Sequence, residues 1–547
     1  MGLMGSLYVG TSGLQTSQNA LNTTAHNMSN IDTTGYTRQQ VQQGTRFYNT
    51  LSKTKTAISY QQIGLGVYYS RVKQVRDYFL DKTYRRESGR SAFYDTSTSA
   101  IEEIENLFQE LQGQTFSNSI KNLWESVQEL AKDPSNSVNQ GVLVQRCNEF
   151  ITRGKAVYKG LCEYQDNLNY KVNDQVETIN AYGRRIVELN QQIMKVEAGQ
   201  IEKANDLRDQ RNLLLDELSA MGNISITEDV DGNFLVQFEG NDFVKDDSIN
   251  EIGLYVDETT GFYTPYWKHL AKTTVNPGGS VDVDISNAKL FNMQQVISTE
   301  TNTDIGSLKA ILFARGDHRA TYEDLGDGSA QGDAYYDQNI SQSIIMDIQA
   351  QFDQLIHKVV TGINGVLKEA AEAAQASNPG SNYLKDSEGN IYQIFNTISN
   401  EKDKFGNPLF SVDNIIINGE LKQSPSLLGF IRPDDKVDQE TADKLKALFE
   451  SEEHTLNPNV KTKTNFINYY SNLVSLVANR GSVLRGISEN QQITVDNTAA
   501  AREQILGVSS DEELSNMIMF QNAYNASSRY INVVSEMLEH IIVTLGR

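Results

Sequence analysis

The side chains best suited to acid–base or metal chemistry are few and widely spaced in this sequence. Among 547 residues there are six histidines and two cysteines. The histidines are His26, His269, His318, His357, His454 and His540. No two of them form the His-Glu-x-x-His pattern or another spacing that places ligands around a zinc ion. The sequence therefore predicts no metal site and gives no histidine a catalytic role.

The two cysteines, Cys147 and Cys162, do not predict a disulfide. They lie 15 residues apart in a stretch with helical periodicity. On a helix this separation spans about 22 Å, which is too far for a bond between the sulfurs. Since no cluster of further ligands surrounds either residue in the sequence, we expect two buried or incidental thiols.

Glycine-rich and acidic motifs also fall short of a site. The segment GDGSAQG at 326–332 follows no predicted strand and lacks the glycine spacing of a phosphate-binding loop. The segment DVDG at 229–232 lacks the later ligands of a calcium-binding loop, so we predict a hairpin turn there. The sequence thus argues for neither an enzyme nor a cofactor. Carboxylates that are brought together only by folding have no signature in the sequence.

An acidic chain of this composition is a poor ligand for nucleic acids and membrane surfaces. The formal net charge is −22, so phosphate backbones and anionic lipids repel it. No run of apolar residues is long enough to cross a bilayer. The first charged residue is Asp32 and the first basic residue is Arg38, which is unlike the basic start of a secretory signal. We expect no nucleic-acid or membrane partner and no cleaved signal peptide.

The N-terminal segment predicts an uncharged helix. Residues 1–31 contain no Asp, Glu, Lys or Arg, and a solvated helix normally carries charges on its outer face, so we expect neighbours on several sides. Gly10 and Gly13 would weaken this helix in isolation. Its narrow apolar seam repeats every seven residues and consists of Leu7, Leu14, Leu21 and Met28. The alternative for a free subunit is a disordered polar leader.

The C-terminal segment predicts a second long helix. Ser510 and Glu513 form a capping box, and Asp511 and Glu512 stand in the first turn, where the helix dipole favours anions. No proline or glycine follows up to Leu545, which allows about 35 residues or ~52 Å of helix. Its broad apolar face contains Leu514, Ile518, Tyr524, Ile531, Leu538 and Ile542. Because isolated helices depend on packing for stability, we expect the terminal helices to pair with each other and then with copies in other subunits.

The region between the ends predicts a helical body. This body comprises 46–223, 303–377 and 438–504, and its strongest helical signal is the seam from Cys162 to Met221. The predicted fold is mainly α with an inserted β domain, and long helices in 1–45 and 505–547 form a coiled-coil axial domain.

Two segments of different texture interrupt this helical body. Residues 224–302 alternate apolar and polar side chains, which predicts the inserted β domain. Residues 378–437 predict a short turn-rich β segment that packs on the body or on the inserted domain. The eight prolines support this division, because none falls in 1–133 or 459–547 and proline breaks helix interiors.

Several segments resemble bacterial flagellar axial proteins. The stretch NTTAHNMSNIDTTGYTRQQV at 22–41 is similar to their N-terminal signature. The signature positions are Asn30, Gly35, Tyr36, Arg38 and Gln39. The Gly-Tyr-x-Arg-Gln ending most resembles the hook-associated protein 1 (FlgK) family. Asp32, Thr34 and Met28 depart from the usual Asn, Pro and Ile of the pattern but are conservative in shape.

The resemblance continues toward the C-terminus in the family's order. Residues 205–219 are similar to its Asn-Asp-Leu…Asp-Gln-Arg helix end, and 306–317 to its return from the inserted domain. The stretch GVSSDEELSNMIMFQNAYNASSRYINVVSEML at 507–538 resembles its C-terminal segment, including Asp511, Glu512 and Glu513. The segment after residue 378 is too short for the extra outer domain of some members, so we expect that domain to be absent.

The resemblance implies a structural role outside the cell, at the junction between flagellar hook and filament. The implied partners are further copies of the chain in a homo-oligomeric ring, the hook protein, a second hook-associated junction protein, and the export chaperone FlgN on the C-terminal helix. Export would use the flagellar type III apparatus. The alternative within the class is a hook or distal rod axial protein. An alternative from another class is an enzyme or glycan-binding module in 224–302, and no motif there supports catalysis.

Overall fold

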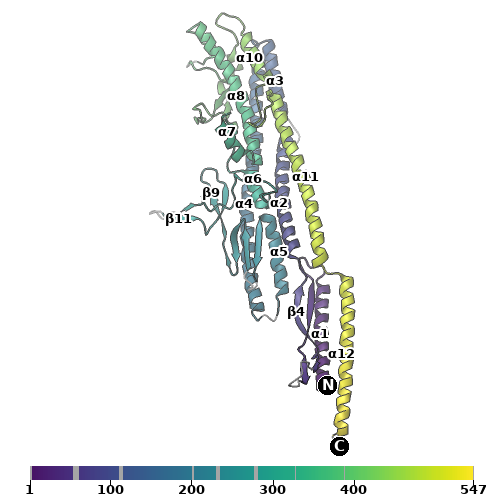
Figure 1. The fold of residues 1–547 in the computed structure, drawn as a ribbon. Coiled ribbons are helices and arrows are strands. Elements are labelled where there is room, and N and C mark those ends of the chain that lie inside the picture. The colour runs from purple at the N-terminus through teal and green to yellow at the C-terminus, as the bar shows by residue number, and fades with distance from the viewer. Residues whose placement is uncertain are drawn as a thin grey trace. The chain divides into compact units, whose positions relative to one another are not determined.

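The computed structural model describes residues 3–52, 61–109, 115–199, 202–229, 234–275, 281–326, 328–386 and 389–545. The fold is mainly helical, at about 62%, with long terminal helices and small inserted β sheets, which confirms the predicted fold class (Figure 1). Contacts divide the chain into two compact units. Unit 1 comprises 1–89, 178–251 and 491–547, and unit 2 comprises 90–177 and 252–490. The four-part domain division predicted from the sequence stays a prediction beside these two units.

The helices account for most of each unit. The long ones are α1 (Leu3–Ser29), α2 (Tyr78–Gln109), α3 (Phe116–Lys132), α4 (Ser137–Glu197), α5 (Asn205–Met221), α8 (Ile344–Ser377), α10 (Gln439–Glu450), α11 (Phe466–Leu506) and α12 (Ser510–Leu545). The shorter ones are α6 (Ser307–Arg315), α7 (Ala330–Tyr335) and α9 (Gly419–Gln423), with helical turns η1 (Tyr322–Leu325), η2 (Tyr336–Ile340), η3 (Val412–Asn414) and η4 (Pro425–Leu428). The unit boundaries fall inside α2, α4 and α11, so each of these helices contributes to both units.

In unit 1 the two terminal helices lie side by side (Figure 1), as the sequence predicts. The face of α12 toward α1 is a heptad seam of partly or fully buried residues: Phe520, Tyr524, Ser527, Ile531, Val534 and Leu538. A β-carbon at Gly10 would lie 2.8 Å from Cγ1 of Ile531, and one at Gly13 would lie 2.8 Å from Oγ of Ser527. The glycines that weaken α1 in isolation therefore permit its close approach to α12.

A β-hairpin covers another side of α1. The strands β1 (Gln39–Thr45) and β4 (Val67–Gln74) pair antiparallel, as do β2 (Asn49–Ser52) and β3 (Gln61–Ile63). The backbone N–H of Val67 donates to Oγ of Ser12, at 3.3 Å. Within α1, the Thr16 hydroxyl donates to the Ser12 carbonyl, at 2.8 Å. Small neutral residues of α1 are thus buried between α12 and the hairpin, which accounts for the charge-free N-terminus.

The structure differs from the sequence prediction at two places in this unit. Strands occupy 39–45, 49–52, 61–63 and 67–74, in a region that the prediction assigned to the helical body from residue 46 on. Burial alternates along β4 with the period of a strand. The predicted helix from Cys162 to Met221 ends at Glu197 and restarts at Asn205. The carboxylate of Glu197 accepts hydrogen bonds from Ala204 N–H at 3.0 Å and from Arg208 Nε at 2.8 Å, which fixes the turn between α4 and α5.

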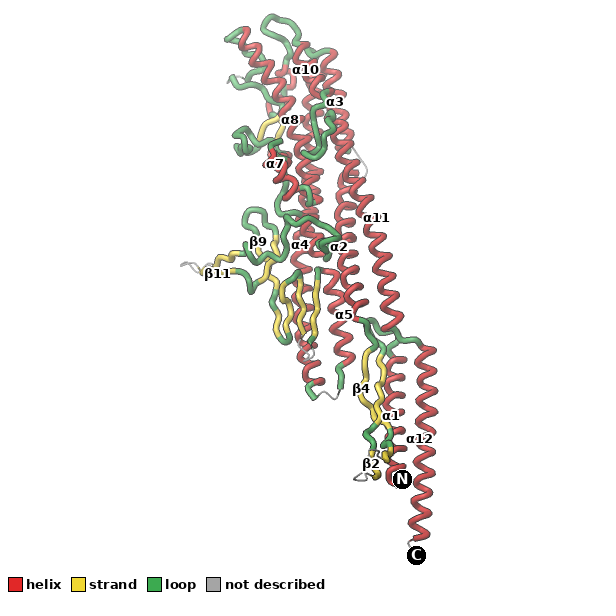
Figure 2. Tube along the Cα trace, viewed as in Figure 1, coloured by secondary structure: helices red, strands yellow, loops and turns green. Residues whose placement is uncertain are grey.

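The region predicted as an inserted β domain contains strands in three separate sheets (Figure 2). In unit 1, β5 (Ile224–Glu228), β6 (Phe234–Phe238), β7 (Asn241–Lys245) and β8 (Ser248–Ile249) form an antiparallel meander. In unit 2, β9 (Ile252–Val256) pairs with β10 (Tyr263–Trp267), and β11 (Lys272–Val275) with β12 (Val281–Asp284). The tip of the hairpin predicted at DVDG lies at 230–232, outside the described residues.

The core of unit 2 is an aromatic cluster among five helices. Phe352 of α8 meets Phe108 of α2 and Phe116 of α3, with ring centroids 6.0 and 4.9 Å apart. Phe116 also meets Phe150 of α4 at 5.3 Å and Tyr470 of α11 at 4.9 Å. These rings bury large apolar areas and hold the helices together.

The turn-rich segment after residue 378 is anchored to the same core. Its strands β13 (Phe395–Thr397) and β14 (Ile415–Ile417) pair antiparallel. The side-chain amide of Asn364 on α8 donates to the Phe395 carbonyl at 2.7 Å and accepts from its N–H at 3.2 Å. The buried amide of Asn364 thus satisfies both backbone polar groups of Phe395.

Candidate functional site: the terminal helices and their clasp

The signature residues after α1 build a tight turn. The Asn27 side chain accepts from the Tyr36 hydroxyl at 2.8 Å and from the Gln39 N–H at 3.0 Å, and it donates to the Gln39 carbonyl at 2.8 Å. Asn30 donates its amide to the His26 carbonyl at 2.9 Å. Gly35 has a φ of +79°, which favours glycine. Together they reverse the chain between α1 and β1.

Arg38 connects this turn to the start of α12. Its Nε donates to Glu513 and its Nη2 to Glu512, both at 2.8 Å, and its backbone N–H donates to the Leu506 carbonyl at 2.9 Å. Burial opposes the charge of Arg38, but these two carboxylates raise its pKa above the ordinary value. Glu513 is only 2% exposed, while Asp511 is exposed in the first turn. The N-terminal and C-terminal signatures, which the sequence presents separately, therefore form one clasp.

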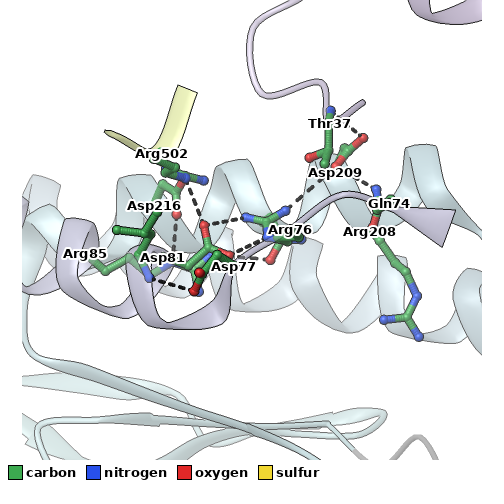
Figure 3. Close-up of polar contacts among 12 residues, drawn as sticks. Thr37, Gln74, Arg76, Asp77, Asp81, Arg85, Arg208, Asp209, Asp216 and Arg502 are labelled. Atoms are coloured by element: carbon green, nitrogen blue, oxygen red, sulfur yellow. Dashed lines mark hydrogen bonds and ion pairs between the residues drawn. The ribbon is translucent and has the colours of Figure 1, made fainter. Parts of the chain in front are cut away.

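The turn is also tied to α5. Gln39 donates through Nε2 to Asp206 at 2.9 Å, and the backbone N–H of Thr37 donates to Asp209 at 3.1 Å. Gln74 at the end of β4 donates to the other oxygen of Asp209 at 2.8 Å. One buried carboxylate on α5 thereby holds both ends of the hairpin segment (Figure 3).

Asp209 begins a buried network of alternating charges (Figure 3). In order of contact its members are Asp209, Arg76, Asp81, Arg502, Asp216 and Arg85. Arg76 Nη1 lies 3.8 Å from Asp209, and its Nη2 donates to Asp81 at 3.2 Å. The network has as many carboxylates as guanidinium groups, so it satisfies buried charge without net excess.

Arg502 joins the last turns of α11 to this network. Its Nη2 donates to Asp216 at 2.6 Å. Its Nε lies 2.8 Å from Asp81 without a hydrogen-bond geometry, so that contact is electrostatic only. Arg85 donates to the second oxygen of Asp216 at 2.6 Å. Segments from α2, α5 and α11 are therefore fixed to one another next to the clasp.

Acidification should stabilise unit 1 through Asp209, contrary to the usual behaviour of a carboxylate. Burial raises the pKa of this carboxyl from 3.8 to about 6, although the contacts with Thr37 and Arg76 oppose the rise. The folded state binds a proton at Asp209 before the unfolded chain does. Its stabilising contribution is therefore fully present below about pH 4 and is lost as the pH rises through 6.

The variant Asp209→Asn, which mimics the protonated form, should remove this part of the pH dependence. A pKa shift from 3.8 to about 6 corresponds to a change of about 3 kcal/mol in the free energy of unfolding between pH 4 and pH 7. Calorimetric unfolding of parent and variant at both pH values measures the difference. A variant that keeps the parent's full pH dependence would show that another group is responsible.

The exposed surface of α12 carries a second apolar stripe. Its members each precede a residue of the seam on α1 by one position, which places them about 100° around the helix. They are Met519, Ala523, Ala526, Tyr530, Val533 and Met537, followed by Ile541, and all are exposed. Tyr530 also borders α1, because its Cδ1 would lie 3.1 Å from a β-carbon at Gly10. Met519 is 54% exposed, Val533 47% and Met537 52%. A regular apolar stripe of this length is unusual, since solvent-exposed helix faces are normally polar.

The burial data divide the apolar face that the sequence presents as one. Tyr524, Ile531 and Leu538 belong to the seam toward α1, whereas Leu514, Ile518 and Ile542 are exposed. The second stripe was missed by the sequence analysis. Its signal is a series of adjacent apolar pairs, such as Tyr530 with Ile531 and Val533 with Val534.

The outer face of α1 is neutral and mostly polar. The exposed residues follow a heptad pattern and are Met4, Tyr8, Thr11, Gln15, Gln18, Asn22, Ala25 and Ser29. The predicted seam residues Leu7, Leu14, Leu21 and Met28 are all partly buried. An exposed face without a single charge can be covered by another helix at a low desolvation cost.

Potential metal ligands do not cluster in the described part of the chain. There, no three His, Cys, Asp or Glu side chains form a group that could hold a metal ion. Cys147 and Cys162 are buried, and burial raises the pKa of both thiols. Among the helices that the structure describes, none is both long enough and apolar enough to cross a bilayer.

Comparison with known families decides what kind of protein carries this clasp. Residues 101–383, more than half of the chain, match the family described as flagellar hook-associated protein FlgK helical domain. The chain belongs to the FlgK family. Its ends match two further families, described as flagella basal body rod protein over 7–37 and as flagellar basal body rod FlgEFG protein C-terminal over 504–543. FlgK-family proteins are structural proteins of the flagellum and not enzymes.

Full-length relatives support the FlgK assignment. The chain is 26% identical over 541 residues to flagellar hook-associated protein 1 of Bacillus subtilis, covering 97% of this chain and 96% of that protein. It is 23% identical over 570 residues to the Salmonella typhimurium protein of the same name, covering 97% and 98%. The solved flagellar hook junction protein FlgK of Burkholderia pseudomallei has a similar fold, with a TM-score of 0.52 at 12% identity, covering 78% of this chain and all of that one.

Proposed function

We propose that this FlgK-family chain is a structural subunit of the junction between flagellar hook and filament. Copies would associate in a ring through the outer face of α1 and the second apolar stripe of α12. The observation that carries this proposal is the exposed stripe from Met519 to Ile541, beside a seam already filled by α1. A helix pair with one satisfied and one unsatisfied apolar stripe is suited to a multi-layered helical assembly.

The clasp explains how such a subunit could transmit force. Arg38 and the two glutamates of α12 hold the terminal pair together at one end, and the buried charge network fixes the neighbouring helices. Charged networks have directional contacts, so they specify one geometry more sharply than apolar packing does. A junction between a bending hook and a stiffer filament requires subunits that keep their shape.

The partners follow from the same surfaces. Hook protein would contact one side of the ring and a second hook-associated junction protein the other. Before assembly, a cytoplasmic chaperone of the FlgN type would cover the apolar stripe of α12, because an exposed stripe of this kind promotes aggregation. We propose that the chain then leaves the cell through the flagellar type III apparatus and functions outside the cell.

A strain that lacks the gene tests the location. We expect electron microscopy to show bare hooks, with flagellin released into the medium. Missing hooks would instead support a hook or distal rod protein. Normal filaments would contradict any axial role.

Complementation of that strain with Val533→Asp tests the surface. A charge in the exposed stripe should abolish filament assembly while the subunit stays folded and is still exported, since burying an unpaired carboxylate between subunits costs several kcal/mol. The matched control is Asn532→Asp, which adds the same charge one position away on the exposed polar side of α12. Normal filaments with Val533→Asp would contradict the assignment of this stripe.

A further inference from the structure

One segment of unit 1 is strongly basic although the whole chain is acidic. Residues 38–89 contain 10 Lys and Arg but only 3 Asp and Glu. Since the chain has a net charge of −22, its remaining residues are more acidic still. Such a local reversal of charge marks a surface for an acidic partner.

The basic segment lines a cleft of about 950 Å³ within unit 1. The walls come from β4, the first turns of α2, α5, and the strands β5 and β6. Eight basic side chains line it: Arg71, Lys73, Arg76, Lys82, Arg85, Lys203, Arg208 and Arg211. The acidic residues in the lining are Asp81, Glu228 and Asp229.

The carboxylates inside unit 1 do not neutralise all of these cations. Glu197 pairs with both Arg208, at 2.8 Å, and Lys203, at 2.7 Å. Glu228 is shared between Arg208 at 2.9 Å and Arg211 at 3.2 Å, and Arg208 points away from the charge network (Figure 3). Lys73 and Lys82 are exposed, and their side-chain amines have no ion pair or hydrogen bond within the described part of the chain.

Two further arginines of the lining, Arg71 and Arg211, have polar groups that no carboxylate neutralises. Arg71 donates its Nε only to the neutral amide oxygen of Gln42, at 2.9 Å. The Nε of Arg211 is buried without an acceptor. Burial lowers the pKa of Arg211 to about 10, against the pull of Glu228, so an additional anion nearby would be favourable.

Exposed aromatic rings stand beside the basic lining. Tyr78, which lines the cleft, is 76% exposed, and the adjacent Phe79 is 74% exposed. Aromatic residues and arginine are enriched in protein interfaces, whereas lone phosphate sites need no such rings. The surface thus suits a protein segment that carries carboxylates next to apolar side chains.

We propose that this cleft docks an acidic segment of a neighbouring copy of the same chain. The inference rests on the proposed function, which places copies side by side. Because residues outside 38–89 contain 67 Asp and Glu against 38 Lys and Arg, a second copy supplies the complementary charge at the high local concentration of an assembly. Complementary charges of this kind set the register between partners more than the total affinity.

Zero-length carbodiimide crosslinking tests the contact directly, because it joins a lysine amine only to a carboxylate in contact with it. Purified flagella and the exported monomer would be treated alike and their crosslinked peptides identified by mass spectrometry. We expect Lys73 or Lys82 to be joined to an aspartate or glutamate of this chain in flagella but not in the monomer. The variant Lys82→Arg should lose the Lys82 crosslink and still assemble.

Charge reversal gives the second readout. The double variant Lys73→Glu/Lys82→Glu should lower incorporation into flagella roughly tenfold, and high salt should weaken the parent's assembly in the same direction. The control Lys461→Glu/Lys463→Glu changes the net charge equally at exposed sites of unit 2. Normal incorporation of the first double variant would overturn the inference.

The outcomes separate this inference from the proposed function. Absence of the protein from flagella would overturn both. Presence of the protein without a lysine crosslink specific to the assembly, or with crosslinks only to a different flagellar protein, would overturn the docking of a second copy and leave the proposed function intact.

Discussion

Replacing Asp81 with asparagine should lower the free energy of unfolding of unit 1 by about 3–5 kcal/mol. Asp81 is buried between Arg76 and Arg502. An amide of the same shape removes the negative charge between two guanidinium groups, so that Arg76 keeps only Asp209, at 3.8 Å, and Arg502 keeps only Asp216, which it shares with Arg85. Removing one member of a buried charge network costs far more free energy than the whole network contributes to stability, because the remaining charges cannot return to water.

Calorimetry and hydrogen exchange would measure this loss. The unfolding transition of unit 1 should move to lower temperature, and amides of α5 and of the last turns of α11 should exchange faster, since both helices are held by the network. The matched control is Asp32→Asn, at an exposed position of the same unit. A loss below about 1 kcal/mol would mean that water or other groups already compensate Asp81.

A triple variant separates geometry from stability. Asp81→Leu combined with Arg76→Met and Arg502→Met should recover most of the lost free energy below about pH 6, where Asp209 is protonated and Asp216 still pairs with Arg85, because buried ion pairs are often no more stable than apolar side chains of similar volume. The same variant should assemble poorly. A network that fixes the orientation of α2, α5 and α11 contributes specificity that apolar packing does not replace.

The terminal helices were the most predictable part of the fold. The capping signature at Ser510 and the absence of proline and glycine predict a helix to Leu545, and the structure has α12 at Ser510–Leu545. Long amphipathic helices are decided by local spacing, which a single sequence contains. The pairing of α1 with α12 was also predictable, because two narrow seams each lack another partner.

Features decided by distant residues were not predictable. The hairpin of β1 and β4 consists largely of polar residues, so its alternation has little contrast until α1 covers one side. The break after α4 depends on Glu197, whose pKa burial would raise but whose hydrogen bonds with Arg208 and Lys203 lower it to about 2. Nothing local distinguishes this glutamate from those on a solvated helix face.

The clasp was visible in the sequence only as two separate signatures. Arg38 and Glu513 are far apart along the chain, and their types alone suggest a solvated surface. The same reason applies to the buried network, because nothing in the sequence marks Arg76, Asp81 or Arg502 as buried. Buried charge networks are invisible to pattern analysis, because periodicity detects apolar residues and assigns charged ones to solvent.

Replacing Ile531 with aspartate should separate the terminal helices within a single subunit. Cγ1 of Ile531 fills the space above Gly10, where a β-carbon would lie only 2.8 Å away. A carboxylate there is desolvated without a partner among the uncharged residues of α1, at a cost of about 2–4 kcal/mol. We expect α1 and the C-terminal half of α12 to become sensitive to protease in the monomer, while unit 2 stays intact, and assembly to fail.

Gly10→Val reaches the same interface from the other helix. Its β-carbon would force Ile531 aside, so this variant should also expose both helices to protease without adding a charge. The decisive comparison is with Val533→Asp, two positions along α12. That side chain lies on the second stripe, so the monomer should be as protease-resistant as the parent and only assembly should fail. Equal protease sensitivity of Ile531→Asp and Val533→Asp would show that the second stripe also holds α1, and would contradict the division of α12 into two faces.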